Sequence, residues 1–343
     1  MKNQLRVIAF LVMLLGGLGL WSLLRAQPAP PSTPVPAVTR VDIDRPVTYW
    51  VDQGFMEMVP PIRLPSTRTE KDRITVWLRV PAGKVIEVEE REWGPTLRYP
   101  PGTAADRVEW RAYSLPDGIQ GWTVLDVRGT RLDAQGREHF HVYLPNGPLP
   151  QAPLFGYEWP RGDASAERAA TDLFVTFLQN APSVSAEGHL MDEAQRDKRV
   201  ALFTKRNDCG GCHRYHKPEA RKRSPQEPLH RPTDALGWYG IYSVLRDAVP
   251  LEYHRPRDMN VADPFVTVSC PEGAPKLLED PKGGRYFVCD QGYVPKGRLD
   301  LEAALAAKDA RAEGLCRSRR YLYEHMDEKG RGVFAEAFRA CGL

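Results

Sequence analysis

The sequence has little excess charge of either sign and no internal repeat. Its 47 lysines and arginines are nearly balanced by 44 aspartates and glutamates, which leaves a formal net charge of +3. That excess is too small to indicate a nucleic-acid-binding protein by itself. The basic residues are spread unevenly, however, because eight of them and only three acidic residues fall between Lys205 and Arg231.

Cysteine is also scarce, with six in 343 residues. Outside the cytoplasm free thiols are unusual, and cysteines are expected to pair. If Cys209 and Cys212 serve another purpose, four remain. The simplest pairing of these four joins neighbours in the sequence: Cys270 with Cys289, and Cys316 with Cys341.

Charge is absent from an apolar run near the N-terminus, Val7–Leu24, which Lys2 and Arg6 precede. The run just reaches the length of a membrane-spanning helix, so it indicates an export segment. A cleavage site is poorly formed, because Leu24 is large where a small residue is wanted. We therefore expect an uncleaved membrane anchor within residues 1–26, with a cleaved signal peptide as the alternative. Either way the body of the protein is expected in the periplasm or otherwise outside the cytoplasm.

Residues 27–39 contain five prolines and no charge, which predicts a stiff spacer. From about residue 46 to 146, apolar residues alternate as in half-buried strands. Six such strands, separated by turn residues, predict an antiparallel sandwich or open barrel over residues 40–160. The six strands are expected at residues 47–51, 73–80, 84–90, 107–113, 122–129 and 139–144.

After Asp163 the apolar spacing becomes helical. Helices are expected over 166–179, with Asp163 or Ser165 as N-cap, and over 191–206. Others are expected over 233–247, 299–316 and 332–341, with a hairpin of 265–270 and 285–289 between them. The expected fold class is thus α+β, with a β-rich N-terminal domain followed by a mainly α-helical domain over residues 161–343.

The helix expected over 191–206 leads into the motif Cys209-Gly-Gly-Cys212-His213. Two thiols separated by two residues can reach the two vinyl groups on one edge of a porphyrin, and the adjacent histidine can then bind the iron. A structural zinc site needs four ligands. His216 and His230 could serve as two of them, but the sequence has no second close cysteine pair. A redox dithiol would need a βαβ context, which the preceding helix argues against. We therefore expect one covalently bound haem c.

The segment ALFTKRNDCGGCHRYH, residues 201–216, resembles the haem-binding segment of class I cytochromes c. The resemblance covers about residues 190–262 and explains nothing before Asp163. It implies a helical haem domain in which Leu202 and Phe203 pack on the haem edge. It also implies that Trp238 contacts a haem propionate, although the sequence fits a core tryptophan at this position equally well.

In that family the sixth iron ligand is usually a methionine some tens of residues downstream, and Met259 has the matching position. A thioether ligand favours the reduced iron. The family usually shows Met-Pro, whereas Asn260 follows here, which leaves the assignment of this ligand open. The competing ligands are His216, His230, His254 and Met326.

Two further pairs of residues could bind a metal but have simpler structural interpretations. His139 and His141 alternate on one strand face and could bind a metal, but with no third ligand visible we expect an exposed or satisfied strand face. Met56 and Met58 are expected to pack rather than to bind copper.

Together these residues predict an exported monohaem c-type cytochrome, an electron carrier rather than an enzyme, which serves periplasmic or membrane redox partners. Basic residues around the motif would attract an acidic partner, unless they only form a solvated loop. These residues are Arg214, Lys217, Arg221, Lys222, Arg223 and Arg231. Two alternatives stay open: a peroxidase-like or P460-like haem enzyme with an open sixth position that oxidises a small molecule, and a structural or sensing module whose β-rich part binds a partner.

Overall fold

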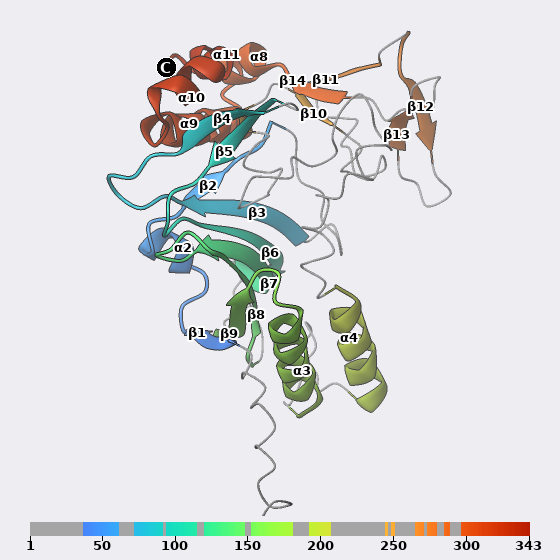
Figure 1. The fold of residues 1–343 in the computed structure, drawn as a ribbon. Coiled ribbons are helices and arrows are strands. Elements are labelled where there is room, and N and C mark those ends of the chain that lie inside the picture. The colour runs from blue at the N-terminus through green and yellow to red at the C-terminus, as the bar shows by residue number, and fades with distance from the viewer. Residues whose placement is uncertain are drawn as a thin grey trace, which may run out of the picture. The chain divides into compact units, whose positions relative to one another are not determined.

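The computed structural model describes the chain from Ala37 to Leu343 with several gaps (Figure 1). The described residues are 37–61, 72–91, 94–114, 120–147, 152–180, 192–206, 244–245, 248–250, 265–270, 273–279, 285–288 and 296–343. Residues Ala37–Leu343 form one compact unit.

Seven antiparallel strands form one sheet. In order across the sheet they are β1 (Thr39–Ile43), β9 (Leu154–Pro160), β8 (Glu138–Pro145), β7 (Gln120–Leu132), β6 (Ala104–Ser114), β3 (Asp72–Arg79) and β2 (Met56–Met58). Strands β6 to β9 follow one another as a meander, because each pairs with the next along the chain. The expected sandwich or open barrel is wrong, since these seven strands make a single open sheet with β1 and β2 at its edges.

One face of the sheet is covered by the N-terminal segment. Trp50 of the short helix α2 (Tyr49–Asp52) shares a core with Ile43, Phe55 and the inward-facing Val108 and Val127 of β6 and β7. These side chains lie on one face because neighbouring positions across paired strands point the same way.

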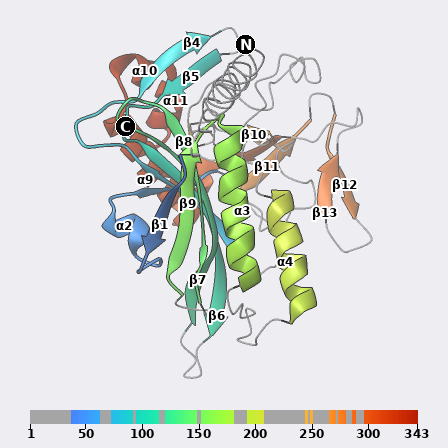
Figure 2. The same cartoon turned by 60° about the horizontal axis from the view of Figure 1, so that its bottom comes forward.

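The opposite face is covered, over β8 and β9, by α3 (Ala164–Asn180) and α4 (Glu193–Arg206), which lie side by side in both views (Figures 1 and 2). Phe174 of α3 packs against Phe155 and Tyr157 of β9, with ring centroids 5.7 and 4.9 Å apart. Asp163 caps α3 as expected, because its Oδ1 accepts hydrogen bonds from the backbone N–H groups of Ser165 and Ala166.

Strands as well as helices follow residue 160. They are β10 (Ala248–Pro250), β11 (Val266–Ser269) and β14 (Lys296–Leu299) in one sheet, β12 (Lys276–Glu279) and β13 (Arg285–Val288) in another, and the helices α8 (Leu301–Ala306), α9 (Ala310–Glu324), α10 (Glu328–Val333) and α11 (Ala335–Arg339). A further hairpin, β4 (Glu87–Arg91) with β5 (Gly94–Arg98), lies outside the seven-stranded sheet.

The C-terminal helices share a hydrophobic core with the N-terminal strands. Leu315 and Leu322 of α9 belong to the same buried cluster as Met58 and Leu78 of β2 and β3. The interface is also hydrogen-bonded, because the hydroxyl of Tyr321 accepts from the backbone N–H of Val80 at 2.9 Å. The expected fold class is therefore wrong: the described residues after 160 contain five strands, and their helices complete a core with the sheet rather than forming a mainly helical domain of their own.

Three local expectations also fail. Residues 47–51 form no strand, because 47–48 lie in a turn and 49–51 belong to α2. Hydrogen bonds from the backbone N–H of Tyr49 to the backbone oxygen of Arg45 and of Asp52 to that of Thr48 close helical turns that bury Trp50. The expected hairpin does not form, since β11 pairs with β14 and β13 with β12. The helix expected over 299–316 is divided where Lys308 adopts φ 55°, and Asp309 then caps α9.

The expected disulfide between Cys316 and Cys341 is confirmed, with Cα atoms 5.3 Å apart. It closes a loop of 25 residues, which in the chain-entropy account stabilises the fold by about 3.5 kcal/mol. Cys270 is disulfide-bonded as well, and its expected partner Cys289 lies outside the described residues.

Glu138, at the start of β8, is a titratable residue whose burial predicts a pH-dependent stability. Burial raises the pKa of Glu138 from 4.5 to about 7, against the opposing effect of its ion pair with Arg161. The folded chain then keeps a proton that the unfolded chain loses, so the free energy of unfolding should fall as pH rises from 4.5 to about 7. The contribution is at most about 3 kcal/mol. Chemical denaturation at several pH values in this window measures the effect. The free energy of unfolding should fall with pH in the wild type and not in Glu138→Gln, and an equal dependence on pH in the two proteins would contradict the prediction.

Candidate functional site

Helix α4 is the described element that leads into the Cys-x-x-Cys-His motif, since it ends at Arg206, three residues before Cys209. Its last turns are held on the protein by Phe203, which is 6% exposed. The Phe203 ring lies 4.9 Å from that of Phe174 of α3, and Val200 packs beside the same core. The sheet and α3 therefore fix the place from which the motif starts.

Leu202 faces the other way. It is 48% exposed, although it is a large apolar residue next to the buried Phe203. The Leu-Phe pair that the sequence singles out is thus divided between two roles, because Phe203 closes a core and Leu202 leaves apolar surface uncovered on the helix that precedes the motif in sequence. Whether either side chain contacts a haem stays a prediction.

A cluster of four charged residues lies on the same sheet face as α4 and borders Phe203. It consists of Arg107 and Glu109 on β6 and Asp126 and Arg128 on β7, which are paired in register as Arg107 with Arg128 and Glu109 with Asp126. Nε of Arg128 donates to Oδ1 of Asp126 at 2.9 Å, and the guanidinium of Arg107 lies 3.7 Å from Glu109 and 3.8 Å from Asp126.

Both carboxylates of this cluster are almost fully buried, with side chains 2% and 5% exposed for Glu109 and Asp126. Buried carboxylates are stable only when paired, and the two guanidinium groups balance them. Cζ of Arg128 lies 5.9 Å from the centroid of the Phe203 ring, within cation–π range. The cluster thereby fixes the sheet surface on which the end of α4 packs.

Most of the sequence-predicted site residues lie outside the described part of the chain. These are Cys209, Cys212, His213, Trp238 and Met259, together with the basic residues between 214 and 231 and the competing ligands His216, His230 and His254.

Met326 is described, and it is a core residue. Its side chain is 1% exposed and belongs to the cluster that α9 shares with the N-terminal strands. Packing around it is tight, because a Cβ added to Gly330 would lie 2.5 Å from Cγ of Met326 and 2.6 Å from Val88. Met326 could reach a haem iron only by leaving this core, which removes it from the competing ligands. Met58 is equally buried and packs as expected.

The sequence missed a second polar site, which lies on the face covered by α2. Asp106, Gly129, His141 and Glu158 form one row across β6, β7, β8 and β9, because each is the register partner of the next. Oδ1 of Asp106 accepts a hydrogen bond from Nε2 of His141 at 2.6 Å, and its Oδ2 accepts one from Nε1 of Trp50 at 2.7 Å.

Gly129 makes room for this pair. A Cβ at position 129 would lie 2.3 Å from both Oδ1 of Asp106 and Nε2 of His141, so a side chain there would separate them. The His141 ring stacks on Tyr143 with centroids 4.8 Å apart, and the hydroxyl of Tyr143 donates to Glu158. Burial and the nearby carboxylates raise the pKa of Tyr143 well above its ordinary value, so the phenol stays protonated and remains a donor.

The Asp106–His141 pair resembles an acid–base dyad in composition, but it is closed to solvent, since each side chain is 3% exposed. Its geometry fits an internal support that attaches α2 to the sheet through Trp50. The expectation of a satisfied strand face for the histidines is met only in part. His139 lies 3.2 Å from Asp133 and Nε2 of His141 pairs with Asp106, but Nδ1 of His141 is buried without a hydrogen-bond partner. Within the described ranges, no three His, Cys, Asp or Glu side chains are grouped as a metal site would require.

One sequence signal could have identified this row. Asp106 and Glu158 occupy inward positions of strands whose other inward positions are apolar or small, and a charge in such a place indicates a buried pair. The histidines of β8 could not be matched to their partner Asp106 in this way, because it comes from a strand distant in sequence.

In comparisons with known proteins, no protein-family model, curated protein or solved structure matches the chain. The apolar segment Val7–Leu24 lies outside the described residues, and none of the described helices is long and apolar enough to cross a membrane.

Proposed function

We propose that the protein binds one haem c through Cys209 and Cys212 and transfers electrons between redox partners outside the cytoplasm. The single observation that carries the proposal is the Cys-x-x-Cys-His motif directly after a helix in a chain with an export segment. The position of α4 supports it, because Phe203 attaches the helix to the sheet and so gives the motif a fixed starting point.

The described residues fit an apolar group at this place. Leu202 is the one large hydrophobic residue of α4 among the exposed ones, and covering it would remove apolar surface from water. The charged cluster beside Phe203 is internally neutralised by its ion pairs, so it leaves no uncompensated carboxylate against such a group.

Four residues have defined tasks in this proposal. Cys209 and Cys212 would form the two thioether bonds, His213 would bind the iron on one side, and Met259 on the other. When bound, haem c supplies a one-electron couple between ferric and ferrous iron. Ligands that stay attached in both oxidation states, and an environment that excludes water, keep the reorganisation small and favour transfer over chemistry on a substrate.

The test uses the full chain made in a host that matures c-type cytochromes. The denatured mass of the wild type should exceed the polypeptide mass by one haem, and a reduced-minus-oxidised spectrum should show a low-spin c-type haem. The double variant Cys209→Ala/Cys212→Ala should lose the added mass completely. The matched control, Cys316→Ala/Cys341→Ala, removes two cysteine sulfurs elsewhere in the chain and should keep the added mass. A wild type with no added mass would overturn the proposal.

The same preparation identifies the sixth ligand. With Met259 on the iron, the oxidised protein should show the methionine-to-iron charge-transfer band, and Met259→Leu should remove the band while the haem stays attached. A high-spin ferric spectrum that shifts with cyanide or peroxide would instead indicate the haem enzyme with an open sixth position, and electron transfer as the sole function would then be wrong.

A further inference from the structure

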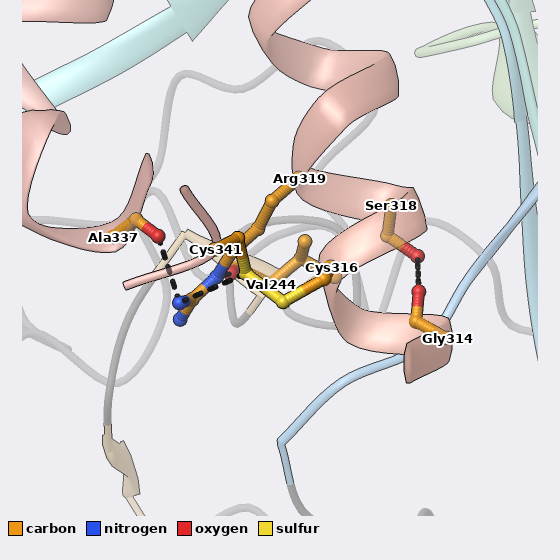
Figure 3. Close-up of a disulfide and its surroundings, with 7 residues drawn as sticks. All are labelled: Val244, Gly314, Cys316, Ser318, Arg319, Ala337 and Cys341. Carbon is orange, nitrogen blue, oxygen red and sulfur yellow. Dashed lines mark hydrogen bonds between the residues drawn. A yellow bond between two sulfur atoms is a disulfide. The ribbon is translucent and has the colours of Figure 1, made fainter. Parts of the chain in front are cut away.

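A buried arginine lies against the Cys316–Cys341 disulfide (Figure 3). Arg319 follows Cys316 by one turn of α9 and is 1% exposed. Its Nε donates to the backbone oxygen of Val244 at 2.8 Å, and its Nη1 donates to that of Ala337 at 2.8 Å. The same Nη1 lies 3.9 Å from Sγ of Cys341.

The two sulfur atoms therefore have different electrostatic surroundings. Of the two sulfur atoms, Sγ of Cys341 is the one that the guanidinium contacts, at 3.9 Å. An arginine stays charged at any relevant pH, and a positive charge beside a sulfur atom favours the thiolate over the thiol. When this disulfide breaks, the negative charge is thus better accommodated on Cys341.

Charge on the departing sulfur governs thiol–disulfide exchange, because a better-stabilised leaving thiolate leaves faster. A disulfide whose reduced form is stabilised is also the stronger oxidant of two otherwise equal disulfides. Both cysteines are partly exposed, so a small thiol or a partner's thiol can approach them.

We propose that Cys316–Cys341 is a thiol–disulfide exchange site whose reductant is a dithiol, with Cys316 as the attacked residue and Cys341 as the leaving group. One thiolate of the dithiol forms a bond to Sγ of Cys316, the bond between the two protein sulfurs breaks, and its electron pair goes to Cys341 as a thiolate beside Arg319. The second thiol of the dithiol then displaces Cys316. The dithiol is oxidised to its disulfide, the protein gains two thiols, and two electrons are transferred.

The exchange would release the covalent bond between α9 and the residues after α11. Arg319 connects this bond to another part of the chain, because it also binds the backbone of Val244, which follows the proposed haem motif in sequence. The site is independent of haem binding, so each proposal can fail without the other. Its natural partner would be a dithiol oxidoreductase outside the cytoplasm.

The direction of attack gives the decisive test. The folded wild-type protein is treated with reduced glutathione, quenched with acid, alkylated with a maleimide, digested and analysed by mass spectrometry. Glutathione should be found on Cys316 and the maleimide on Cys341, in excess over the reverse product by on the order of tenfold. Arg319→Gln should bring the two products close to equal amounts and slow reduction by dithiothreitol, whereas Arg319→Lys should keep the preference for Cys316.

One control accompanies this measurement. Arg320→Gln removes the same charge from an exposed neighbour on α9 and should leave the product ratio unchanged. If Arg319→Gln does not fold, the wild-type product ratio and Arg319→Lys still decide. Equal products in the wild type or attack mainly at Cys341 would each overturn the proposal.

Discussion

Replacing Asp106 with alanine is expected to lower the free energy of unfolding by about 3 to 5 kcal/mol. The carboxylate accepts from both Trp50 and His141 in a part of the sheet that water does not reach. Its removal leaves two buried donors without an acceptor, and each such group costs about 1 to 3 kcal/mol. Urea denaturation followed by circular dichroism measures the loss. Asp106→Asn should fall between the two proteins, because its amide offers an oxygen to only one of the donors.

Asp42 provides the matched control for this prediction. It is also a strand aspartate with a side-chain partner, Arg40 at 2.9 Å, but its side chain is 54% exposed. Exposed pairs contribute between 0 and about 1 kcal/mol, so Asp42→Ala should leave the denaturation midpoint nearly unchanged. If the two alanine variants lost similar amounts of stability, Asp106 would not be the support of α2 that its geometry indicates.

The sequence predicted those elements whose residues carry their own periodicity. The alternation in 73–80 and 139–144 gave β3 and β8, and Asp163 marked the start of α3 correctly. The pairing of Cys316 with Cys341 followed from their being neighbours. In each of these cases the information is local, so tertiary contacts were not needed to identify it.

The arrangement of these elements could not be predicted in the same way. Strand alternation does not say which strands pair, so the single open sheet and the return of β1 beside β9 were missed. Residues 47–51 alternate like a strand but lead through a turn into α2, because burying Trp50 on the sheet outweighs local preference. The core that Leu322 shares with Leu78 joins residues more than 200 positions apart, and no local pattern signals such a contact.

The same limit applies to the candidate sites. The Cys-x-x-Cys-His motif is readable because its chemistry lies within five consecutive residues. Asp106 and His141 are separated by 35 positions and meet only through the register of β6, β7 and β8. The contact between Arg319 and Cys341 depends on how α9 and α11 pack. Sites assembled across strands or helices become visible only when the topology is known.

Replacing Phe203 with alanine is expected to lower the free energy of unfolding by about 3 to 5 kcal/mol, the usual cost of deleting a buried aromatic ring. The ring fills the space between α4, Phe174 of α3 and the sheet, so its loss leaves a cavity and frees the end of α4. Because the motif starts three residues after α4, the haem proposal adds that Phe203→Ala should also reduce the fraction of chains that acquire haem. Denaturation measures the first effect, and the ratio of haem absorbance to protein measures the second.

Leu202→Ala separates packing from haem binding. The two residues are adjacent and apolar, yet Leu202 is 48% exposed, so its truncation should cost the haem-free protein well under 1 kcal/mol. If haem covers this side chain, Leu202→Ala should destabilise the haem-loaded protein more than the haem-free Cys209→Ala/Cys212→Ala background. An equal and small effect in both backgrounds would show that Leu202 stays in water and that the haem does not lie against this face of α4. A large effect in the haem-free background would instead contradict the division of roles between Leu202 and Phe203.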